Sequence, residues 1–502
     1  MSSSIPSSSS GASNQLNSRG THTRWLWFVI AAAAVIRIIY ALRKSLVLDE
    51  FHSYFHASRE TVTSFFSTLV LDNHPPLSFA IISGSRALFG EGEFALRLPA
   101  LLYGLLELFI VARIAKRIGL SRGRGAAIGL LAASSLHLDF STQARMYALH
   151  ALAVTGLVEA LLGTLSAPKE PIGKARFRVG LWLTVGLLNH YFFIQYGFWI
   201  ALAGLIAMRG QWSRLKCLIT PTIVALVLVS PWYLTGFREQ LAHQLPPGGA
   251  NVGLKSLAEA FVHMFFLNVR IGGPTLRIVF IASGALAIVL AGLGLLRLYA
   301  SRPVSADRST PVLLGAVAFL VPLATTVTAA LFARAGFTWH YVLPSAAALA
   351  LLAAVQSDRS RLGRGVLHLV TASALLLSIL NAKSVGTEDY RGAVRTVAER
   401  FSPGDAVISV EWQPPLFPQA QPWNYYVNRL PATVGASPRA LSMSSGFNLD
   451  APAELSQYER IWVLSSYLPD QARLLRTLRE SFTQTSTERF GFQPILLVFE
   501  KR

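Results

Sequence analysis

A polar stretch directly after the first apolar segment is the most informative part of the sequence. It begins with Leu48-Asp49-Glu50-Phe51-His52 and ends with Asp72-Asn73-His74-Pro75-Pro76-Leu77. Carboxylates and imidazoles gather here, in a chain of which only 14% of the residues are charged. Charged groups at the border of a membrane are costly unless they are solvated, paired or used. The stretch is therefore the first candidate for a functional site.

The composition around this stretch is that of a membrane protein. Of the 502 residues, 52% are hydrophobic, and the mean hydropathy is +0.45. We therefore expect an α-helical polytopic membrane protein in contact with membrane lipids. The net charge of +19 is explained by basic loops, so no nucleic-acid partner is expected. The single cysteine, Cys217, rules out an intramolecular disulfide.

Eleven apolar segments approach the length of about 20 residues that crosses a bilayer as a helix. They cover residues 25–42, 94–115, 125–138, 148–166, 179–190, 192–208, 217–235, 276–299, 311–333, 339–356 and 365–382. The first segment is long and contains Arg37, so we interpret it as an uncleaved span rather than a signal peptide. The Ser-rich residues 1–23 before it have the composition of a disordered cytoplasmic tail.

The basic loop residues predict the orientation of the spans. If the N-terminus is inside, the even-numbered connections are internal and should carry most of the Lys and Arg. They carry Arg113, Lys116, Arg117, Arg122, Arg124, Lys169, Lys174, Arg176, Arg178, Arg209, Arg214, Lys216, Arg297, Arg302, Arg308, Arg359, Arg361 and Arg364. This pattern holds only if residues 75–90 do not cross the membrane. We therefore predict two interfacial helices in the first external loop, over about 51–71 and 75–90.

Beyond residue 383 the chain changes to a soluble character. Residues 388–401 and 471–481 are typical of helices, and residues 405–410, 461–465 and 495–499 of strands. This alternation predicts a small C-terminal α/β domain. We expect three parts: the tail 1–23, a transmembrane catalytic domain 24–382 and an extracytoplasmic domain 383–502. A bacterial inner (plasma) membrane is the expected location.

The other predicted external loops add further polar residues. His137, Asp139, Arg145 and Tyr147 lie between the third and fourth spans. His190 and Tyr191 join the fifth and sixth spans, and Arg334 and His340 join the ninth and tenth. Loops that converge on one face can form a single pocket. We assign Arg145, Tyr147, His74, His340 and Arg334 to a phosphate-binding site, and Asp72, Asp139, His190 and Tyr191 to the substrate pocket.

The acidic and histidine residues also have purely structural interpretations. Asp49 caps a helix in such an interpretation, because an acidic side chain accepts the unpaired amides of the first turn. Glu50 either orients its neighbour or reacts. His52 and His56, one turn apart, form a metal site only together with Glu60. The spacing is not that of His-Glu-x-x-His, so we expect no metal there.

The cation of the second external loop has two interpretations as well. In the structural interpretation, the Arg145 side chain extends from the membrane so that its guanidinium lies in water. In the functional interpretation it binds a phosphate, since a guanidinium presents several fixed donors to phosphate oxygens. Asp139 either pairs with Arg145 or contacts the substrate. His190 and His340 are common residue types at an interface, and their shared side favours a functional role slightly.

At these motifs the chain resembles the membrane glycosyltransferases of the C superfamily that use polyprenyl-phosphate sugars, and among them the protein O-mannosyltransferases and aminoarabinose transferases. The similarity covers residues 25–235 well and the remainder loosely. The matching pieces are Leu48-Asp49-Glu50, Asp72-Asn73-His74-Pro75-Pro76-Leu77, Phe89-Gly90, Ala95-Leu96-Arg97-Leu98-Pro99, Gln143-Ala144-Arg145-Met146-Tyr147-Ala148-Leu149, Asn189-His190-Tyr191 and Pro231-Trp232-Tyr233.

The resemblance implies roles for several residues. Asp49 matches the catalytic aspartate and Glu50 its neighbour. His74 flanks the second motif of the first loop, and Arg145 and Tyr147 match a segment near the donor phosphate. Asp72 stands where relatives place an acidic residue beside the Pro motif, so the supporting carboxylate is either Glu50 or Asp72. The first loop has no Asp-x-Asp, which favours a branch that needs no metal.

The chemistry agrees with this resemblance. A sugar on a lipid phosphate already carries a leaving group, so the protein must deprotonate an acceptor hydroxyl and neutralise the departing phosphate. One carboxylate and a few cations suffice, and attack from the opposite face inverts the anomeric centre. We expect a polyprenyl-phosphate sugar and a glycan, lipid or protein acceptor as partners, and no cofactor. The alternative is a transporter or flippase, but it would favour internal repeats, and none is evident.

Overall fold

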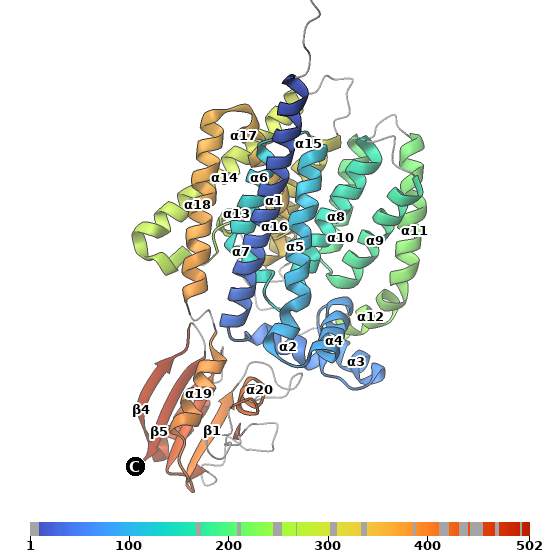
Figure 1. Ribbon diagram of the computed structural model, residues 1–502. Coiled ribbons are helices and arrows are strands. Elements are labelled where there is room, and N and C mark those ends of the chain that lie inside the picture. The colour runs from blue at the N-terminus through green and yellow to red at the C-terminus, as the bar shows by residue number, and fades with distance from the viewer. Residues whose placement is uncertain are drawn as a thin grey trace, which may run out of the picture.

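The computed structural model describes residues 10–166, 172–207, 212–243, 254–267, 269–301, 309–332, 339–384, 388–410, 421–430, 440–441, 455–466, 471–491 and 494–502. Most of these residues belong to a helical bundle, and a small sheet lies at one end of it (Figure 1). Arg334 and residues 1–9 fall outside the described ranges, so the structure does not test what was expected of them.

Seven stretches of helix in the described residues are long and apolar enough to cross a membrane. They are α1 (Ser10–Arg43), α5 (Glu93–Arg117), α8 (Tyr147–Ser166), α11 (Trp212–Leu234), α14 (Gly273–Ala300), the run from α15 (Ser309–Gly315) through the π-helical Ala316–Leu320 to α16 (Val321–Phe332), and α18 (Arg361–Lys383). The chain is therefore a multi-pass integral membrane protein. Within their membrane windows, 94% of α8 is buried but only 22% of α11, so α8 lies at the centre and α11 at the rim.

Shorter helices complete the bundle. They are α6 (Gly123–Ala133), α7 (Ser135–Phe140), α9 (Ile172–Asn189), α10 (Phe193–Ala207), α17 (Ser345–Arg359) and the 3₁₀ turn η3 (Trp339–Val342). Every one of the eleven predicted apolar segments thus falls on helix. The helical class is confirmed, while the number of eleven crossings stays a prediction.

Three boundaries differ from the sequence-based expectation. The predicted segment 125–138 breaks at Ser134, whose hydroxyl accepts the N–H of His137 and starts α7. The predicted segment 339–356 begins as the 3₁₀ turn η3 and becomes α-helical only at Ser345, after Pro344. Residues 10–23, expected to be disordered, form the first turns of α1, because extending an existing helix avoids the cost of nucleation.

Three helices of the first loop lie together at the end of the bundle that carries the sheet, whereas α1 begins at the opposite end (Figure 1). α4 (Leu77–Phe89) is close to the second interfacial helix that we predicted. The first predicted helix is instead two, α2 (Leu48–Ala57) and α3 (Val62–Leu69). The Thr61 hydroxyl caps α3 by accepting the N–H of Ser64, and this separates the two.

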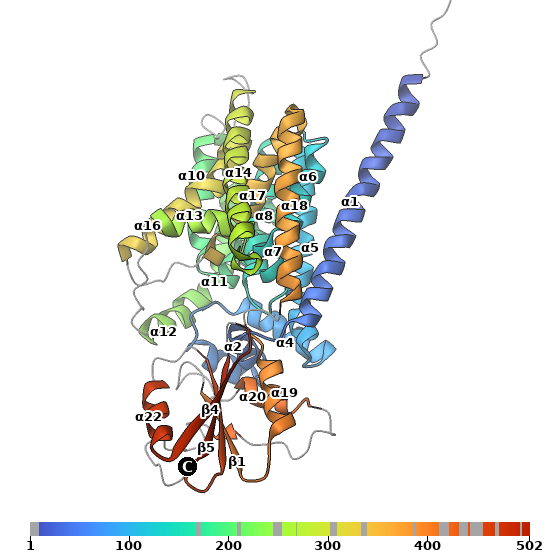
Figure 2. The same ribbon diagram turned by 90° about the vertical axis from the view of Figure 1, so that its left-hand side faces the viewer.

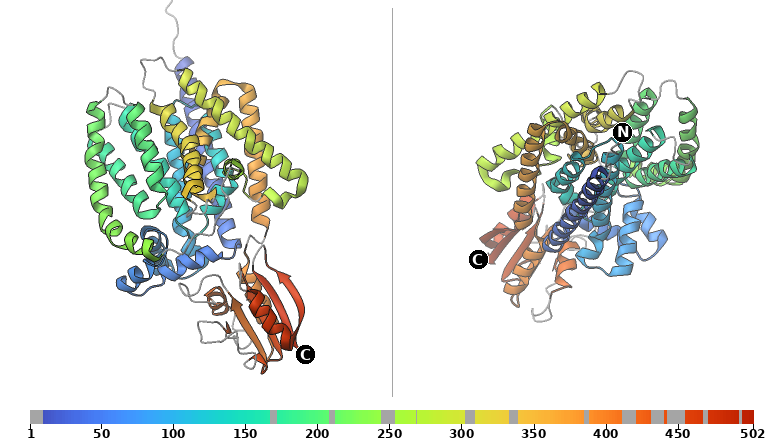
Figure 3. Two further views of the ribbon diagram at one scale, coloured as in Figure 1. Left: turned by 180° about the vertical axis from the view of Figure 1, so that it is seen from behind. Right: turned by 45° about the horizontal axis from the view of Figure 1, so that its top comes forward.

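Several short helices have no counterpart in the sequence-based prediction. α12 (Gly236–His243) contacts the end of α3, where Gln240 donates to the carbonyl oxygen of Leu69. α13 (Leu254–His263) precedes the 3₁₀ turn η1 (Val269–Gly272). α12, α13 and η1 are each too short to show a clear helical periodicity of hydrophobic residues in the sequence. Figure 3 shows from behind that α12 follows α11 at the end of the bundle nearest the sheet.

The sheet has five strands in the order β2-β1-β3-β5-β4. Figure 2 shows β1, β4 and β5 of this sheet below the helical bundle. The strands are β1 (Asp405–Val410), β2 (Ala440–Leu441), β3 (Arg460–Ser465), β4 (Phe482–Arg489) and β5 (Ile495–Lys501), with helices α19 (Tyr390–Arg400), α20 (Gln421–Val427) and α22 (Gln471–Ser481). β1 pairs in parallel with β2 and β3, and β5 pairs antiparallel with β3 and β4. We call the described part of residues 388–502 the C-terminal module.

The C-terminal module packs directly on the first loop. Phe51 of α2 is 1% exposed and shares one hydrophobic core with residues of α19, α20 and the sheet. The module and α2 therefore lie on the same side of the membrane. Whether that side is extracytoplasmic stays a prediction.

Candidate active site

The start of α2 separates two neighbouring carboxylates. The N–H of Val47, the residue before the helix, donates to Oε2 of Glu50 at 3.0 Å, which completes a capping interaction at the first turn. Glu50 is fully buried, whereas Asp49 is exposed. Of the two carboxylates, Asp49 is therefore the one that a substrate can reach.

Glu50 is held by Arg97 of α5 on both oxygens. Nε of Arg97 lies 2.7 Å from Oε1, and Nη2 lies 2.5 Å from Oε2. The N–H of Ala144 also donates to Oε1, at 2.8 Å. Both oxygens of this buried carboxylate are thus occupied by hydrogen bonds within the protein. Of the two roles considered for Glu50, its contacts favour the orienting one.

Arg97 joins Glu50 to the end of α1. It donates hydrogen bonds of 2.7–2.8 Å to the carbonyl oxygens of Ala41, Lys44 and Ser45. One guanidinium thus fixes three carbonyls and one carboxylate at the point where the chain leaves the bundle. Sequence analysis quoted Arg97 only as part of a motif. A cation four residues inside an apolar segment was the signal of its role.

Arg145 lies on the other side of α2. Its Nη1 donates to the carbonyl oxygen of Asp49 at 3.1 Å and to Oγ of Ser53 at 3.4 Å. The residue is 6% exposed, and its buried Nε has no hydrogen-bond partner among the described residues. A buried guanidinium with an unused donor is not a side chain that extends into water. The geometry therefore favours the clamp over the structural interpretation of Arg145.

The charge of Arg145 acts on the Asp49 carboxylate. Burial among protein atoms alone would raise the pKa of Asp49. The positive charge of Arg145 outweighs it and holds the pKa of Asp49 below its ordinary value. Because the side chain is exposed, solvent moderates both effects. Asp49 is therefore ionised at neutral pH and lies in the field of the Arg145 charge.

Asp72 binds two histidines. Its Oδ2 lies 2.8 Å from Nε2 of His56, and its Oδ1 lies 2.9 Å from Nδ1 of His74. Burial alone would raise the pKa of Asp72, but these hydrogen bonds hold it well below its usual range. This arrangement joins α2 to the segment before α4. His56, which we considered only for a metal site, is thus used to fix Asp72.

His74 is oriented by its bond to Asp72. Burial lowers the pKa of His74 below its ordinary value, despite the opposite effect of Asp72, so the ring is neutral at pH 7. A neutral ring that donates Nδ1–H to a carboxylate presents Nε2 as a hydrogen-bond acceptor. Without a ligand, His74 therefore adds no positive charge to the site at pH 7.

Three histidines and one tyrosine from four chain segments gather near Arg145; we call them the His–Tyr cluster. The ring centroids of Tyr147 and His340 are 4.4 Å apart, those of Tyr147 and His190 are 5.7 Å apart, and those of His74 and His190 are 5.6 Å apart. The guanidinium carbon of Arg145 lies 5.8 Å from the Tyr147 ring centroid. The structure thus brings together residues that are as far apart in sequence as His74 and His340.

Tyr191 lies behind this cluster. Its hydroxyl donates to Oε1 of Gln240 at 2.5 Å, and the indole N–H of Trp232 donates to that hydroxyl at 3.0 Å. The amide of Gln240 in turn donates to the carbonyl oxygens of Leu69 and His74. Tyr191 therefore supports the loop that carries His74. Gln240 is a further residue that sequence analysis missed, because α12 was not predicted.

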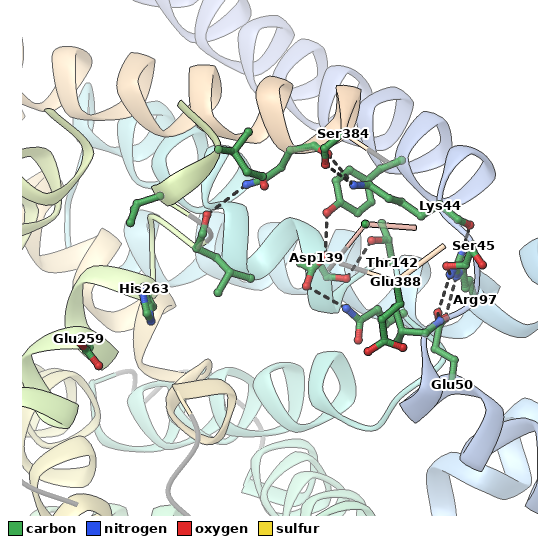
Figure 4. Close-up of a pocket in the computed structure, with 18 of the residues that line it drawn as sticks. Lys44, Ser45, Glu50, Arg97, Asp139, Thr142, Glu259, His263, Ser384 and Glu388 are labelled. Carbon is green, nitrogen blue, oxygen red and sulfur yellow. Dashed lines mark hydrogen bonds and ion pairs between the residues drawn. The ribbon is translucent and has the colours of Figure 1, made fainter. Parts of the chain in front are cut away.

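Asp139 lies elsewhere, in a cavity of about 560 Å³ between the bundle and the C-terminal module. The hydroxyl of Tyr40 donates to Oδ1 at 2.8 Å, and the amide of Gln143 donates to Oδ2 at 2.9 Å. Figure 4 shows Asp139 between His263 on one side of this cavity and Lys44 on the other, with Glu50 and Arg97 on the same side as Lys44. No contact of Asp139 with Arg145 is among the described ones, so Asp139 belongs to a second compartment.

The predicted site residues therefore fall into three groups. Asp49, Arg145 and the His–Tyr cluster form one face, with Asp72 orienting His74. Glu50 and Asp139 line the cavity, and Tyr191 supports the site from behind. Among the described residues, no group of three or more His, Cys, Asp or Glu is placed to hold a metal ion. Independence from metal stays a prediction.

Several solved structures resemble the chain in outline. Apo ArnT from Cupriavidus metallidurans is 18% identical over 95% of this chain and 98% of that one, with a TM-score of 0.48. The arabinofuranosyltransferase AftD from Mycobacteria is 13% identical over 95% and 40%, with a TM-score of 0.48. The oligosaccharyltransferase AglB from Archaeoglobus fulgidus is 11% identical over 92% and 72%, with a TM-score of 0.49. None of the curated proteins compared with the chain matches it.

A family model described as dolichyl-phosphate-mannose-protein mannosyltransferase matches residues 73–234. This segment begins next to His74 and contains Arg145, Tyr147 and His190. The resemblance that the motifs predicted is thereby confirmed. Over this segment the chain is similar to the mannosyltransferases that this family model describes.

Proposed function

We propose that the protein transfers a sugar from a polyprenyl-phosphate donor to an acceptor hydroxyl, with inversion of the anomeric centre and with Asp49 as the general base. The observation that carries this proposal is the placement of Asp49 and Arg145. An exposed carboxylate lies next to a buried guanidinium that has an unused donor. The reaction needs these two groups, one to accept a proton and one to bind the departing phosphate.

The phosphate of the donor is bound by Arg145 in this proposal. Its free Nε–H points to a fork-like contact with phosphate oxygens, because a guanidinium offers parallel donors. Tyr147, His340 and His74 surround the same place. A bound phosphate would raise the pKa of His74, whose ring would then carry a proton and add a positive charge.

The acceptor hydroxyl loses its proton to Asp49. As its oxygen bonds to the anomeric carbon, the bond from that carbon to the phosphate oxygen breaks and the electron pair leaves with polyprenyl phosphate. Attack opposite to the leaving group inverts the centre, so no covalent sugar–enzyme intermediate forms. The low pKa of Asp49 keeps the carboxylate ready across the neutral range.

The membrane arrangement is part of the proposal. We propose eleven spans with an internal tail 1–23 and basic internal loops, so that Asp49 and residues 383–502 face the outside at the inner membrane of a bacterium. The domain division at residues 24–382 and 383–502 follows from this arrangement. The contact between Phe51 and the C-terminal module supports a common side for both.

The decisive experiment uses the purified full-length protein in detergent with polyprenyl-phosphate hexoses and pentoses. We expect mass spectrometry to detect release of polyprenyl phosphate together with a glycosylated acceptor from membrane extracts, and NMR of the product to show the inverted anomer. Asp49→Asn serves as the inactive control. Sugar or lipid movement across vesicles by both the wild type and Asp49→Asn, without transfer in either, would instead establish the transporter or flippase.

A further inference from the structure

Three consecutive backbone amides at the end of the α1–α2 connection are each bound by a side chain. The N–H of Leu46 donates to the Tyr426 hydroxyl at 2.7 Å, and the N–H of Leu48 donates to Oε2 of Glu388 at 2.5 Å. The N–H of Val47, between them, donates to Glu50. Two of these three acceptors therefore come from the C-terminal module, which follows more than 300 residues later in the sequence.

The same module binds the connection at a further point. The backbone N–H of Arg391 donates to Oγ of Ser45 at 3.1 Å, and the Tyr426 hydroxyl lies 3.0 Å from that same Oγ. Tyr426 donates its own proton to Oε1 of Glu93, at 2.6 Å. Its hydroxyl therefore joins the α1–α2 connection, the start of α5 and the module.

The rings of the module enclose the first turn of α2. Phe51 makes edge-to-face contacts with Tyr390, Tyr425 and Tyr426, at centroid distances of 5.7, 5.6 and 6.0 Å. Such contacts fix direction as well as burying area. Asp49 lies in this same turn, two residues before Phe51. A rotation of this turn would therefore move the Asp49 carboxylate, although the module residues contact Leu46, Leu48 and Phe51.

We propose that Tyr426 and Glu388 are positioning residues for Asp49: by binding the amides of Leu46 and Leu48, they fix the start of α2 and the direction of the Asp49 side chain relative to Arg145. This inference rests on the proposed function of Asp49. Figure 4 shows Glu388 and Ser45 on the same wall of the cavity as Glu50 and Arg97. The carbonyls of this connection are held from the bundle by Arg97, and two of its amides are held from the module.

The consequence for catalysis follows from geometry. A displacement of about 1 Å at a reacting group can lower a rate by about 10²-fold. Loss of one amide acceptor lets the start of α2 move without removing any group that binds the donor. We therefore expect an effect on kcat, with the KM for the donor unchanged.

Tyr426→Phe tests the hydroxyl, and Tyr425→Phe is the matched control. Both rings pack on Phe51, but the Tyr425 hydroxyl donates to the carbonyl oxygen of Glu91 rather than binding the connection. We expect Tyr426→Phe to lower kcat at least about tenfold relative to the control. Its acid limb should also move to higher pH, as Asp49 moves away from the Arg145 charge. Equal kcat values and equal pH profiles for the two variants would overturn the inference.

Glu388 is tested by a conservative pair. Glu388→Gln keeps an oxygen that accepts the N–H of Leu48, whereas Glu388→Ala removes it. We expect near-normal kcat for Gln and about tenfold loss for Ala. Equal losses in both, or a change confined to the KM for the acceptor, would contradict the positioning role, because Glu388 also lines the cavity.

A measurement that needs no substrate separates this inference from the proposed function. In a Cys217→Ser background, a nitroxide label at Asp49→Cys should become more mobile in Tyr426→Phe than in Tyr425→Phe. The same spectrum in both variants would overturn the inference on its own. Full activity of Asp49→Asn would overturn the proposed function, whatever the spectra show.

Discussion

Arg97 and Glu50 form a two-pronged ion pair in the interior, with Nε 2.7 Å from Oε1 and Nη2 2.5 Å from Oε2. Both side chains are at most 2% exposed. The pair joins α5 to α2 at the point where the chain leaves the bundle. Because both oxygens of Glu50 are bound by Arg97, the neighbouring Asp49 is the carboxylate that is available to react.

Removing one partner of the pair should destabilise the protein strongly. Glu50→Gln leaves Arg97 buried with an uncompensated charge, which typically costs about 3–5 kcal/mol. We expect a marked fall in the thermal unfolding temperature in detergent, for Glu50→Gln and for Arg97→Gln alike. The double variant should lose less than the sum of the two single changes, since the residues interact directly. Strictly additive losses would show that they act independently.

Asp49→Asn should abolish transfer while leaving the fold intact. The change keeps the shape and removes the basicity, and general base catalysis is typically worth about 10²–10⁴-fold. Donor binding, measured by retention of the polyprenyl-phosphate sugar on purified protein, should persist. If chelators silence the wild type and a divalent ion restores the variant, Asp49 is a metal ligand instead. Near-normal turnover at saturating substrates would direct attention to Asp72.

The charge of Arg145 should be visible in the pH profile. Its positive charge lowers the pKa of Asp49, so the base stays ionised until the pH falls below the ordinary carboxyl range. Arg145→Gln removes the charge, the pKa of Asp49 rises, and the acid limb of kcat should move to higher pH. Arg145→Lys should keep the limb but raise the KM for the donor, because a point charge replaces the fork. Unchanged donor kinetics in both variants would refute the phosphate clamp.

The orientation can be measured with single cysteines in a Cys217→Ser background. Thr63 of α3 and Gln484 of β4 are both exposed. Cysteines at these positions should react with an impermeant maleimide in intact cells. A cysteine at the exposed Arg122, which follows α5 at the other end of the bundle, should react only after permeabilisation. Labelling of Arg122→Cys in intact cells would reverse the predicted orientation.

Hydrophobic patterns carried most of the fold prediction. Every long apolar run is helix, because in a bilayer the backbone must satisfy its own hydrogen bonds. Periodicity also located α19, α22, β1, β3 and β5. It missed β4, whose sequence Phe-Thr-Gln-Thr-Ser-Thr-Glu-Arg is polar nearly throughout and which is defined by its pairing with β5. The composition of a segment does not reveal such pairing with a strand elsewhere in the chain.

The site could be predicted only as a set of residues. The predicted side of the loops put Asp49, Arg145 and His74 in one group, and the structure brings these three residues together. Loops on one side of a membrane share a limited surface, so their residues are often neighbours. The sequence did not distinguish the exposed Asp49 from the buried Glu50, since their directions depend on how α2 begins. The sequence also did not predict that Arg97 binds Glu50 or that His56 binds Asp72. These contacts depend on how α2 packs against its neighbours in three dimensions.

The attachment of the α1–α2 connection to Tyr426 and Glu388 has a consequence for biogenesis. A ribosome completes Asp49 and Arg145 long before it reaches Tyr426 and Glu388. These two side chains lie 380 residues after Leu46 and 340 residues after Leu48, respectively. A nascent or truncated chain can insert its helices and present the carboxylate, but the first turn of α2 is not yet fixed. Under the proposed function, the site that contains Asp49 is therefore complete only after the last segment of the chain has been synthesised.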